Sequence, residues 1–285
     1  MYTSKIKVCS LDVFGTDVQH FWTGNLSVLQ DLPNMQHPHK NDFYTLLFTV
    51  DASGRLQIDT EEICVAEPSI IIIEPGCVNS IVLGENASGK VICFSEAFFS
   101  LRYNNNILNH FSLFQKEQRI ITSINNDQLE RLNKLLQMAE AEFARKLSDS
   151  LKVLRSYVNI ILFEMERLLS TAYSIQKNDL NSEKIQQFKK LIEKHYTTNK
   201  LPSYYAESMN ISVNYLNRLC KEKTNLTAGD IIRKHIAIEA QRLLQFTTLN
   251  INEIANALGF ESASYFITFF KKQLGITPEQ FRKNH

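Results

Sequence analysis

Cysteine is the residue type here best suited to metal binding or covalent chemistry, and its spacing limits both. The five cysteines are Cys9, Cys64, Cys77, Cys93 and Cys220. Their number is odd and no two form a CxxC pair, which argues against a disulfide framework and against a zinc knuckle. We therefore expect mostly reduced core residues, with Cys220 on the inward face of its helix.

Basic side chains, which could bind phosphate, are concentrated in the last third of the chain. Residues 181–285 contain 15 Lys and Arg against 9 Asp and Glu, whereas residues 1–180 contain 16 against 21. A basic surplus attracts a phosphate backbone, although a solvated lysine-rich surface gives the same count. The charge pattern is compatible with DNA binding by this region and does not establish it.

The overall composition is that of a globular protein with room for two domains. The chain has 285 residues, of which 44% are hydrophobic and 21% charged. No apolar run approaches the roughly 20 residues that a membrane span requires. Residues 1–10 lack the apolar segment of an export signal. We predict a cytoplasmic protein that does not enter the membrane.

Short apolar stretches alternate with turn-forming residues from Val8 to Phe99. Leu56 and Ile58 alternate with polar residues, as in a half-buried strand, whereas the unbroken run Ile70–Ile73 indicates a strand covered on both faces. This pattern predicts an antiparallel β-barrel or sandwich in residues 1–122.

The apolar period becomes helical after residue 126, with Asp127 as the expected N-cap. A second, leucine-rich helix is predicted from about Asp149 to Leu169. We assign residues 123–176 to a helical region that packs on the strands, forms a dimer interface, or does both. The polar stretch Lys177–Ser182 is the predicted linker to a helical domain in residues 177–285.

Two similar segments lie within that domain, at about residues 201–223 and 251–273. An offset of 49 residues pairs Ala206 with Ala255, Asn210 with Gly259, Leu216 with Tyr265 and Cys220 with Phe269. Each segment has a small residue where two helices can approach, a turn residue able to adopt positive φ, and then an amphipathic helix. This pattern predicts two helix-turn-helix units, whose second helices fit the major groove of DNA. The alternative is a helical bundle with a coincidental repeat.

Several motifs resemble the C-terminal signature of AraC/XylS-type transcription regulators. In the second segment and beyond they are Ile254-Ala255, Leu258-Gly259-Phe260, Ser264-Tyr265-Phe266, Phe270-Lys271-Lys272, Gly275-Ile276-Thr277-Pro278 and Phe281-Arg282. The first segment resembles the family at Ala206, Ser212, Tyr215-Leu216, Arg218 and Lys221, and the connecting stretch at Glu239–Leu244. The resemblance covers about 100 residues. It implies a sequence-specific DNA-binding regulator, not an enzyme, with an all-α double helix-turn-helix domain in an α+β chain.

The resemblance also implies which side chains meet DNA. The expected base contacts are Asn214, Asn217, Arg218, Ser264 and Thr268, and the expected backbone contacts are Ser212, Tyr215, Lys221, Ser262, Lys271 and Lys272. Arginine suits guanine and asparagine suits adenine, whereas the family commonly places arginine where this chain has Thr268. We therefore expect the first unit to supply most base specificity and the second mainly to hold the phosphate backbone.

The stretch from His37 to Phe43, with Gly54 and Pro75–Asn79, resembles a cupin-type sensor domain. His37 and His39 are spaced like two metal ligands, but Asn79 stands where related domains often have a third histidine. We predict no metal, no cofactor and no catalytic residue. A small apolar or polar effector is expected instead, and its candidate contacts are His39, Phe43, Tyr44 and Trp22.

The expected partners are double-stranded promoter DNA, RNA polymerase, a small-molecule effector and a second copy of the chain. Two rival functions are a metal-dependent cupin enzyme, which predicts bound metal, and an architectural DNA-binding protein, which predicts little sequence preference. We expect the protein to activate transcription. The sequence specifies neither the effector nor the operator, and it decides neither the oligomeric state nor activation against repression.

Overall fold

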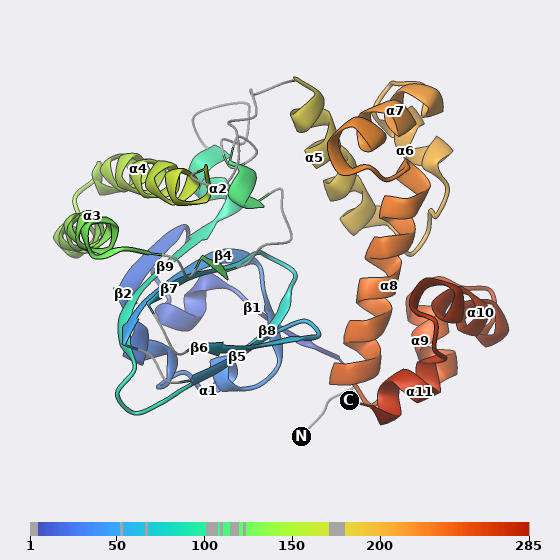
Figure 1. The fold of residues 1–285 in the computed structure, drawn as a ribbon, viewed down its shortest axis with the longest axis horizontal. Coiled ribbons are helices and arrows are strands. Elements are labelled where there is room, and N and C mark those ends of the chain that lie inside the picture. Colours follow the sequence, from blue (N-terminus) through green and yellow to red (C-terminus); the bar gives the residue numbers. More distant parts are fainter. Residues whose placement is uncertain are drawn as a thin grey trace. The chain divides into compact units, whose positions relative to one another are not determined.

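The computed structural model describes residues 5–51, 54–65, 68–100, 108, 111–114, 120–121, 124–170 and 180–284. It divides into two compact units, one drawn from residues 7–177 and the other mainly from residues 178–285. The first, here the sheet unit, contains strands with flanking helices, and the second, the helical unit, contains only helices among its described elements (Figure 1). The predicted mixed α+β class is confirmed. Within the described ranges, no helix is both long enough and apolar enough to cross a membrane.

The described strands of the sheet unit form two five-stranded sheets, in the orders β1-β3-β8-β5-β6 and β10-β7-β4-β9-β2. The strands are β1 (Lys7–Cys9), β2 (Phe21–Asn25), β3 (His39–Asn41), β4 (Phe43–Asp51), β5 (Gly54–Ile58), β6 (Glu61–Val65), β7 (Ser69–Ile73), β8 (Val78–Leu83), β9 (Ser88–Ser95) and β10 (Ile120–Ile121). The short helices between them are η1 (Leu11–Phe14), η2 (Leu26–Leu29), α1 (Pro33–Gln36), α2 (Glu96–Ser100) and η4 (Ser112–Phe114).

This arrangement decides between the two expected alternatives, a barrel and a sandwich, and it corrects the expectation that all neighbouring strands are antiparallel. The described strands close no barrel, because each sheet keeps two edge strands that closure would have paired. The strands β1 and β3 also run parallel, whereas the other neighbours in both sheets are antiparallel. The sheet unit is therefore a sandwich of two separate sheets.

The strand β7 shows how both faces of the second sheet are covered. Ile71 and Ile73 join a core shared with the first sheet, including Leu56 and Ile58. Ile70 and Ile72 point to the opposite face, where they pack with helical residues. Adjacent residues of a strand point to opposite faces, so an unbroken run of isoleucines can be buried only between two layers. The predicted two-sided burial of this run is confirmed.

Two long helices form the layer on that opposite face, namely α3 (Asn126–Arg145) and α4 (Ser150–Ser170) (Figure 1). Their apolar stripes share one core with the second sheet, including Leu136 and Ile161. The N-cap of α3 is Asn125, not the expected Asp127, because Asn125 and Gln128 satisfy each other's backbone N–H groups in a capping box.

The helical unit consists of seven described helices. They are α5 (Leu180–His195), α6 (Pro202–Ser208), α7 (Val213–Thr224), α8 (Ala228–Phe246), α9 (Ile251–Ala257), α10 (Ala263–Leu274) and α11 (Pro278–Lys283). The predicted linker overlaps the first of them, because Leu180, Asn181 and Ser182 already belong to α5. Residues 177–179 lie outside the described part of the chain.

Two apolar cores lie along α8, one near each end. Ile232 and Ile236 of α8 pack with α5, α6 and α7, whereas Ala240 and Leu244 pack with α9, α10 and α11. Tyr196 and Phe260 are partly buried against both cores. The helical unit therefore contains two small modules that share one connecting helix (Figure 1).

Candidate nucleic-acid interface

The first helix-turn-helix is formed by α6 and α7. Ala206 is buried where the helices approach, and Asn210 in the turn adopts φ 53°, as its position in the repeat predicts. The hydroxyl oxygen of Ser212 caps α7 by accepting a hydrogen bond from the Tyr215 backbone N–H at 3.1 Å. The predicted small residue, left-handed turn and amphipathic second helix are all present, and the Ser212 cap is an addition that the sequence pattern did not predict.

The two sides of α7 have different chemistry. Leu216, Leu219 and Cys220 are fully buried, which confirms the inward position predicted for Cys220. Asn214, Arg218 and Lys221 are exposed on the remaining surface. Hydrogen-bonding and cationic groups on one side of a helix are what a major-groove contact requires.

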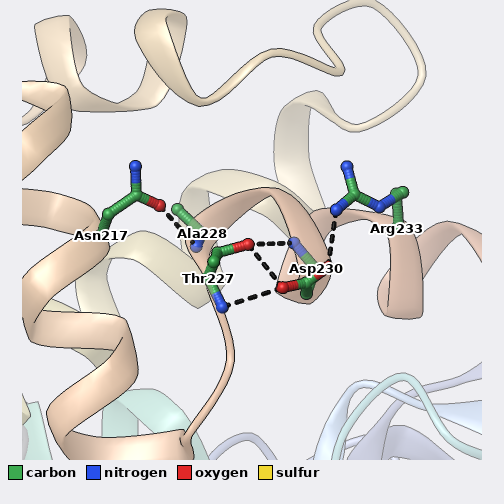
Figure 2. A network of polar contacts seen from close by, with 5 residues as sticks. All are labelled: Asn217, Thr227, Ala228, Asp230 and Arg233. Carbon is green, nitrogen blue, oxygen red and sulfur yellow. Dashed lines mark hydrogen bonds and ion pairs between the residues drawn. The ribbon is translucent and has the colours of Figure 1, made fainter.

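Asn217 has a partner that the sequence analysis missed. Its side-chain Oδ1 accepts a hydrogen bond of 3.0 Å from the backbone N–H of Ala228, at the first turn of α8 (Figure 2). Next to it, Thr227 and Asp230 form a capping box, and Asp230 also contacts Arg233 at 2.6 Å. These hydrogen bonds and the ion pair lower the pKa of Asp230 to about 2. Asn217 therefore fastens α7 to α8, and its oxygen is occupied in this structure.

Tyr215 contacts two cations. The Lys184 ammonium is 4.7 Å from the centre of its ring and donates a hydrogen bond of 3.1 Å to its hydroxyl. The Arg218 guanidinium is 5.1 Å from the same ring, and its Nε is 3.8 Å from a carboxylate oxygen of Glu222. These contacts orient Arg218 while its side chain stays 66% exposed.

The second helix-turn-helix is formed by α9 and α10. Gly259 in the turn adopts φ 67°, and Ser262 caps α10 by accepting a hydrogen bond from the Tyr265 backbone N–H at 3.4 Å. Gly275 ends α10 in a left-handed conformation, and a capping box at Thr277 starts α11. The positive φ that the repeat predicts for the turn residue is confirmed at Gly259.

The offset of 49 residues holds only up to the turn. Ala206 and Ala255 occupy the same place, as do Asn210 and Gly259, but the N-caps Ser212 and Ser262 are 50 residues apart. The second turn contains one extra residue, Glu261. From that point the equivalent pairs are Leu216 with Phe266, Asn217 with Ile267, Arg218 with Thr268 and Cys220 with Phe270. Leu216 and Phe266 are both fully buried, whereas Tyr265 is 65% exposed, so the predicted pairing of Leu216 with Tyr265 is wrong.

None of the exposed side chains of α10 carries an amide or a guanidinium group; they are Ser264, Tyr265, Ile267, Thr268, Lys271 and Lys272. The Thr268 hydroxyl donates a hydrogen bond of 2.9 Å to the Ser264 carbonyl oxygen one turn earlier, so its donor is already occupied. Ile267 is 37% exposed, and Lys271 and Lys272 are exposed in the last turn. This surface offers methyl groups, hydroxyl groups and cations where α7 offers amide and guanidinium groups.

The four candidate effector contacts do not lie together. Trp22 and Phe43 belong to the core between the sheets, where Trp22 stacks on Phe14 at 4.0 Å. Tyr44 points to the opposite face of its sheet and stacks on Phe94 at 5.2 Å. His39 is buried whereas His37 is exposed, so the two histidines do not form a pair of ligands. Among the described residues no group of three or more His, Cys, Asp or Glu side chains is arranged to hold a metal ion.

A small polar cluster accompanies His39 in the interior of the sheet unit. His39 pairs with Asn79 across β3 and β8, and Asn41 is two residues further along β3. All three side chains are almost fully buried. Burial lowers the pKa of His39, so its ring is neutral at neutral pH.

Two capped helices, each in a helix-turn-helix and each with an exposed face, define a DNA-binding protein. Residues 205–284 match a family model described as a helix-turn-helix domain. The chain is a DNA-binding transcription regulator, and this matched region is similar to that of AraC/XylS-type regulators.

Several known proteins are similar to this chain in sequence or in structure. The DNA-binding dual transcriptional regulator Rns of Escherichia coli is 25% identical over 252 residues, which cover 84% of this chain and 89% of Rns. A probable transcription factor, PqrA of Proteus vulgaris, is 37% identical over 70 residues, covering 25% of this chain and 57% of PqrA. A structure of ToxT from Vibrio cholerae aligns with a TM-score of 0.43 and 16% identity, covering 93% of this chain and 98% of ToxT.

Proposed function

We propose that this regulator recognises promoter DNA chiefly through the first helix-turn-helix, holds the backbone with the second, and responds to a small effector in the sheet unit. The observation that carries the proposal is the contrast between the exposed groups of α7 and α10. Asn214 and Arg218 offer paired hydrogen bonds, whereas Ile267 and Thr268 offer methyl groups.

Phosphate binding is proposed at the start of both helices. The hydroxyl oxygens of Ser212 and Ser262 accept backbone hydrogen bonds, so their hydroxyl protons are free to be donated to phosphate. A helix N-terminus also favours an anion. Lys221, Lys271 and Lys272 add positive charge further along, and Tyr215 contributes through the cations that it positions. These contacts would act on any DNA sequence.

Base recognition is proposed for Asn214 and Arg218 in α7, with smaller contributions from Ser264 and Thr268 in α10. We revise the expected role of Asn217. A bidentate contact with adenine needs its oxygen as an acceptor, and that oxygen already accepts from Ala228. Asn217 is therefore proposed to position α7, with only its amide N–H group available to DNA.

The test is the affinity of the full chain for the region upstream of its own gene, compared with a scrambled duplex at the same salt concentration. A sequence-specific regulator should bind the upstream region with an affinity about 1,000-fold or more above that for the scrambled duplex. A ratio near one would contradict the proposal and support an architectural DNA-binding protein.

The effector proposal is supported by the buried cluster around His39. The Nδ1 of His39 lies 2.8 Å from the His37 carbonyl oxygen, which can only accept, so Nδ1 carries the proton and Nε2 is an acceptor. His39 Nε2, Asn41 Oδ1 and Asn79 Oδ1 are buried and make no hydrogen bond of good geometry among the described residues, although an interaction with the Asn41 side chain raises the pKa of His39 against the larger effect of burial. Three buried acceptors on one face favour a ligand with hydroxyl or amine donors, because unsatisfied buried acceptors are costly.

Trp22 offers a direct test, since it is the only tryptophan in the sequence and lies in the core of the same unit. We expect its fluorescence to shift when the chain is titrated with members of a panel of neutral polyols and amino alcohols, and the shift to be lost in His39→Leu. The absence of any response in the wild type would contradict the effector proposal. Stoichiometric metal in the purified chain, with activity lost to a chelator, would support the enzyme alternative.

Self-association is proposed through α4. Its surface exposes Ile160 and Phe163, three residues apart on one side of the helix, which a second copy of the chain would cover. Ile160→Glu should convert a dimer into a monomer in sedimentation velocity experiments, and an unchanged sedimentation coefficient would contradict this interface.

A cytoplasmic location and activation through contact with RNA polymerase complete the proposal, in keeping with regulators that act on promoters.

A further inference from the structure

A short loop of the first module contacts the turn of the second helix-turn-helix. The loop joins α5 to α6 and contains Thr197 and Lys200. The Lys200 ammonium donates hydrogen bonds to the carbonyl oxygens of Gly259, at 2.5 Å, and of Thr197, at 3.2 Å. The same ammonium lies 4.9 Å from the centre of the Phe260 ring. One cation therefore joins two segments that are about 60 residues apart in sequence.

The backbone of the turn is equally close to the loop. A Cβ atom placed on Gly259 would lie 1.7 Å from the Thr197 carbonyl oxygen, so a side chain at this position would collide with the loop. Phe260 packs against the cores of both modules, as does Tyr196 at the start of the loop. We call the contacts among Thr197, Lys200, Gly259 and Phe260 the inter-module bridge.

The bridge is stronger than an ordinary surface contact of a lysine. Lys200 is only partly exposed, and burial lowers the pKa of its ammonium group. A partly desolvated ammonium gains more from carbonyl oxygens and an aromatic ring than one in water does. Substituting the lysine would leave the Gly259 carbonyl oxygen without this donor.

The bridge has a geometric consequence for the two DNA-contacting helices. With α8 alone, the modules would be joined at one element, and bending or twisting at its ends would change the angle between α7 and α10. The bridge adds a second attachment close to the turn that precedes α10. Two attachments restrict rotation of one module about the other.

We propose that the inter-module bridge fixes the spacing and rotation of α7 relative to α10, and thereby fixes the spacing of the two DNA subsites that the protein accepts. Lys200 is then a positioning residue that does not touch DNA. This inference rests on the proposed DNA-binding function and extends it from which bases are recognised to how far apart they must lie.

The test uses the full chain and duplexes that the wild type selects from a random pool. One base pair is then inserted between the two subsites. The wild type should lose about 30-fold or more in affinity on insertion, since one base pair rotates the second subsite by roughly a tenth of a helical turn. Lys200→Met should bind the selected duplex several-fold more weakly than the wild type does. On insertion of the base pair, its affinity should fall by only about 3-fold. Lys200→Arg, which keeps a donor, should behave as the wild type.

The matched control is Lys194→Met, which removes the same charge from an exposed position on α5. It should keep the wild-type dependence on spacing. An unchanged spacing dependence in Lys200→Met would overturn the proposal. A uniform loss on every duplex, with the slope of log affinity against log salt reduced by about one, would also overturn it and would make Lys200 a phosphate contact.

A measurement without DNA separates this inference from the proposed function. Hydrogen exchange of the free full chain should show the Gly259 and Phe260 amides exchanging faster in Lys200→Met than in Lys194→Met. Equal exchange would overturn the bridge whatever the DNA experiments gave. Failure of the wild type to select any sequence, with faster exchange in Lys200→Met, would overturn the proposed function and leave the bridge supported.

Discussion

The two helix-turn-helix units share a backbone plan and differ in what they expose. Ala206 and Ala255 allow the same close helix packing, and Asn210 and Gly259 make the same left-handed turn. The chemistry differs most past the N-caps, where Arg218 on α7 is replaced by Thr268 on α10. Repetition of a fold therefore conserves the residues that shape the backbone, while the groove-facing positions are free to take different roles.

The units also differ in how they are fastened. The first recognition helix is attached to α8 through the Asn217 side chain, and Ile267 occupies the equivalent position in the second, which has no such oxygen. The second unit is attached through its turn, at Gly259 and Lys200. One unit is thus positioned from its recognition helix and the other from the turn that precedes it.

The largest expected effect is on stability, and it comes from substitutions in the turns of the two helix-turn-helix units. Gly259→Ala should destabilise the region from α9 to α10 by about 3 kcal/mol, because it combines a left-handed backbone conformation with overlap on the Thr197 carbonyl oxygen. Asn210→Ala should cost about 1 kcal/mol, since it loses only a residue that tolerates positive φ. Hydrogen exchange of the full chain measures both. Similar values would show that the second turn is not held more closely than the first.

Arg218 tests the difference in base recognition. Arg218→Ala should weaken binding to a selected duplex by roughly 1 to 3 kcal/mol and relax the preference at one base pair. Thr268→Ala at the equivalent position should cost less than about 0.5 kcal/mol. Binding is measured by fluorescence anisotropy with each base substituted in turn. A uniform loss on all sequences in Arg218→Ala would assign the arginine to the backbone.

Substitution of Asn217 tests whether this residue stabilises the fold and does not recognise a base. Asn217→Ala should lower stability by about 1 kcal/mol, because the first turn of α8 loses a hydrogen bond to a side chain. Its effect on DNA affinity should be the same for every base substitution. Urea denaturation and base-by-base binding together measure this. A specific loss at one adenine with unchanged stability would restore Asn217 as a base contact.

Removal of thymine methyl groups tests whether α10 recognises DNA through apolar contacts. Replacing thymine by deoxyuridine in the subsite of α10 should weaken binding by about 0.8 kcal/mol for each methyl in contact, roughly 4-fold. The loss should shrink in Ile267→Ala, since the partner of the methyl is then removed. The same replacement in the subsite of α7 serves as the control and should have little effect. Equal losses in both subsites would remove this distinction.

The smallest expected effect concerns pH. The pKa of Asp230 is lowered to about 2 from its ordinary 3.8, so its contribution to stability is complete above about pH 4 and is lost as the pH falls through 2. Because the side chain is partly exposed, we expect only about 0.5 kcal/mol between wild type and Asp230→Asn at pH 6. The difference should shrink as the pH is lowered through 3 in urea denaturation. A difference independent of pH would contradict the ionic origin.

Sequence reasoning predicted the features that depend on local spacing. The turn residues with positive φ and the two-sided burial of Ile70–Ile73 follow from residue types within a few positions. The opposite orientations of Phe43 and Tyr44 also follow from the two-residue period of a strand, and that signal was available in the sequence.

The features that sequence reasoning missed depend on contacts between distant segments. The bond from Asn217 to Ala228 and the bridge from Lys200 to Gly259 join segments whose proximity no local pattern encodes. Strand alternation likewise indicates buried faces without stating which strands pair, so it could not separate a barrel from two sheets. The extra residue, Glu261, was not predicted from the sequence. Apolar residues of the two helices coincide at an offset of 49 residues as well as at an offset of 50.

The central claim is that the two units contribute unequally to recognition of DNA, and a complete base-substitution profile tests it most directly. Every base pair of a duplex selected by the full chain is replaced in turn, and the affinity is measured at one salt concentration. Orientation on the duplex is assigned by cleavage from a probe attached near α11. The predicted result is that the largest losses fall in the subsite of α7, with small losses at thymines in the subsite of α10. Equal losses in the two subsites, or larger losses beneath α10, would contradict the account.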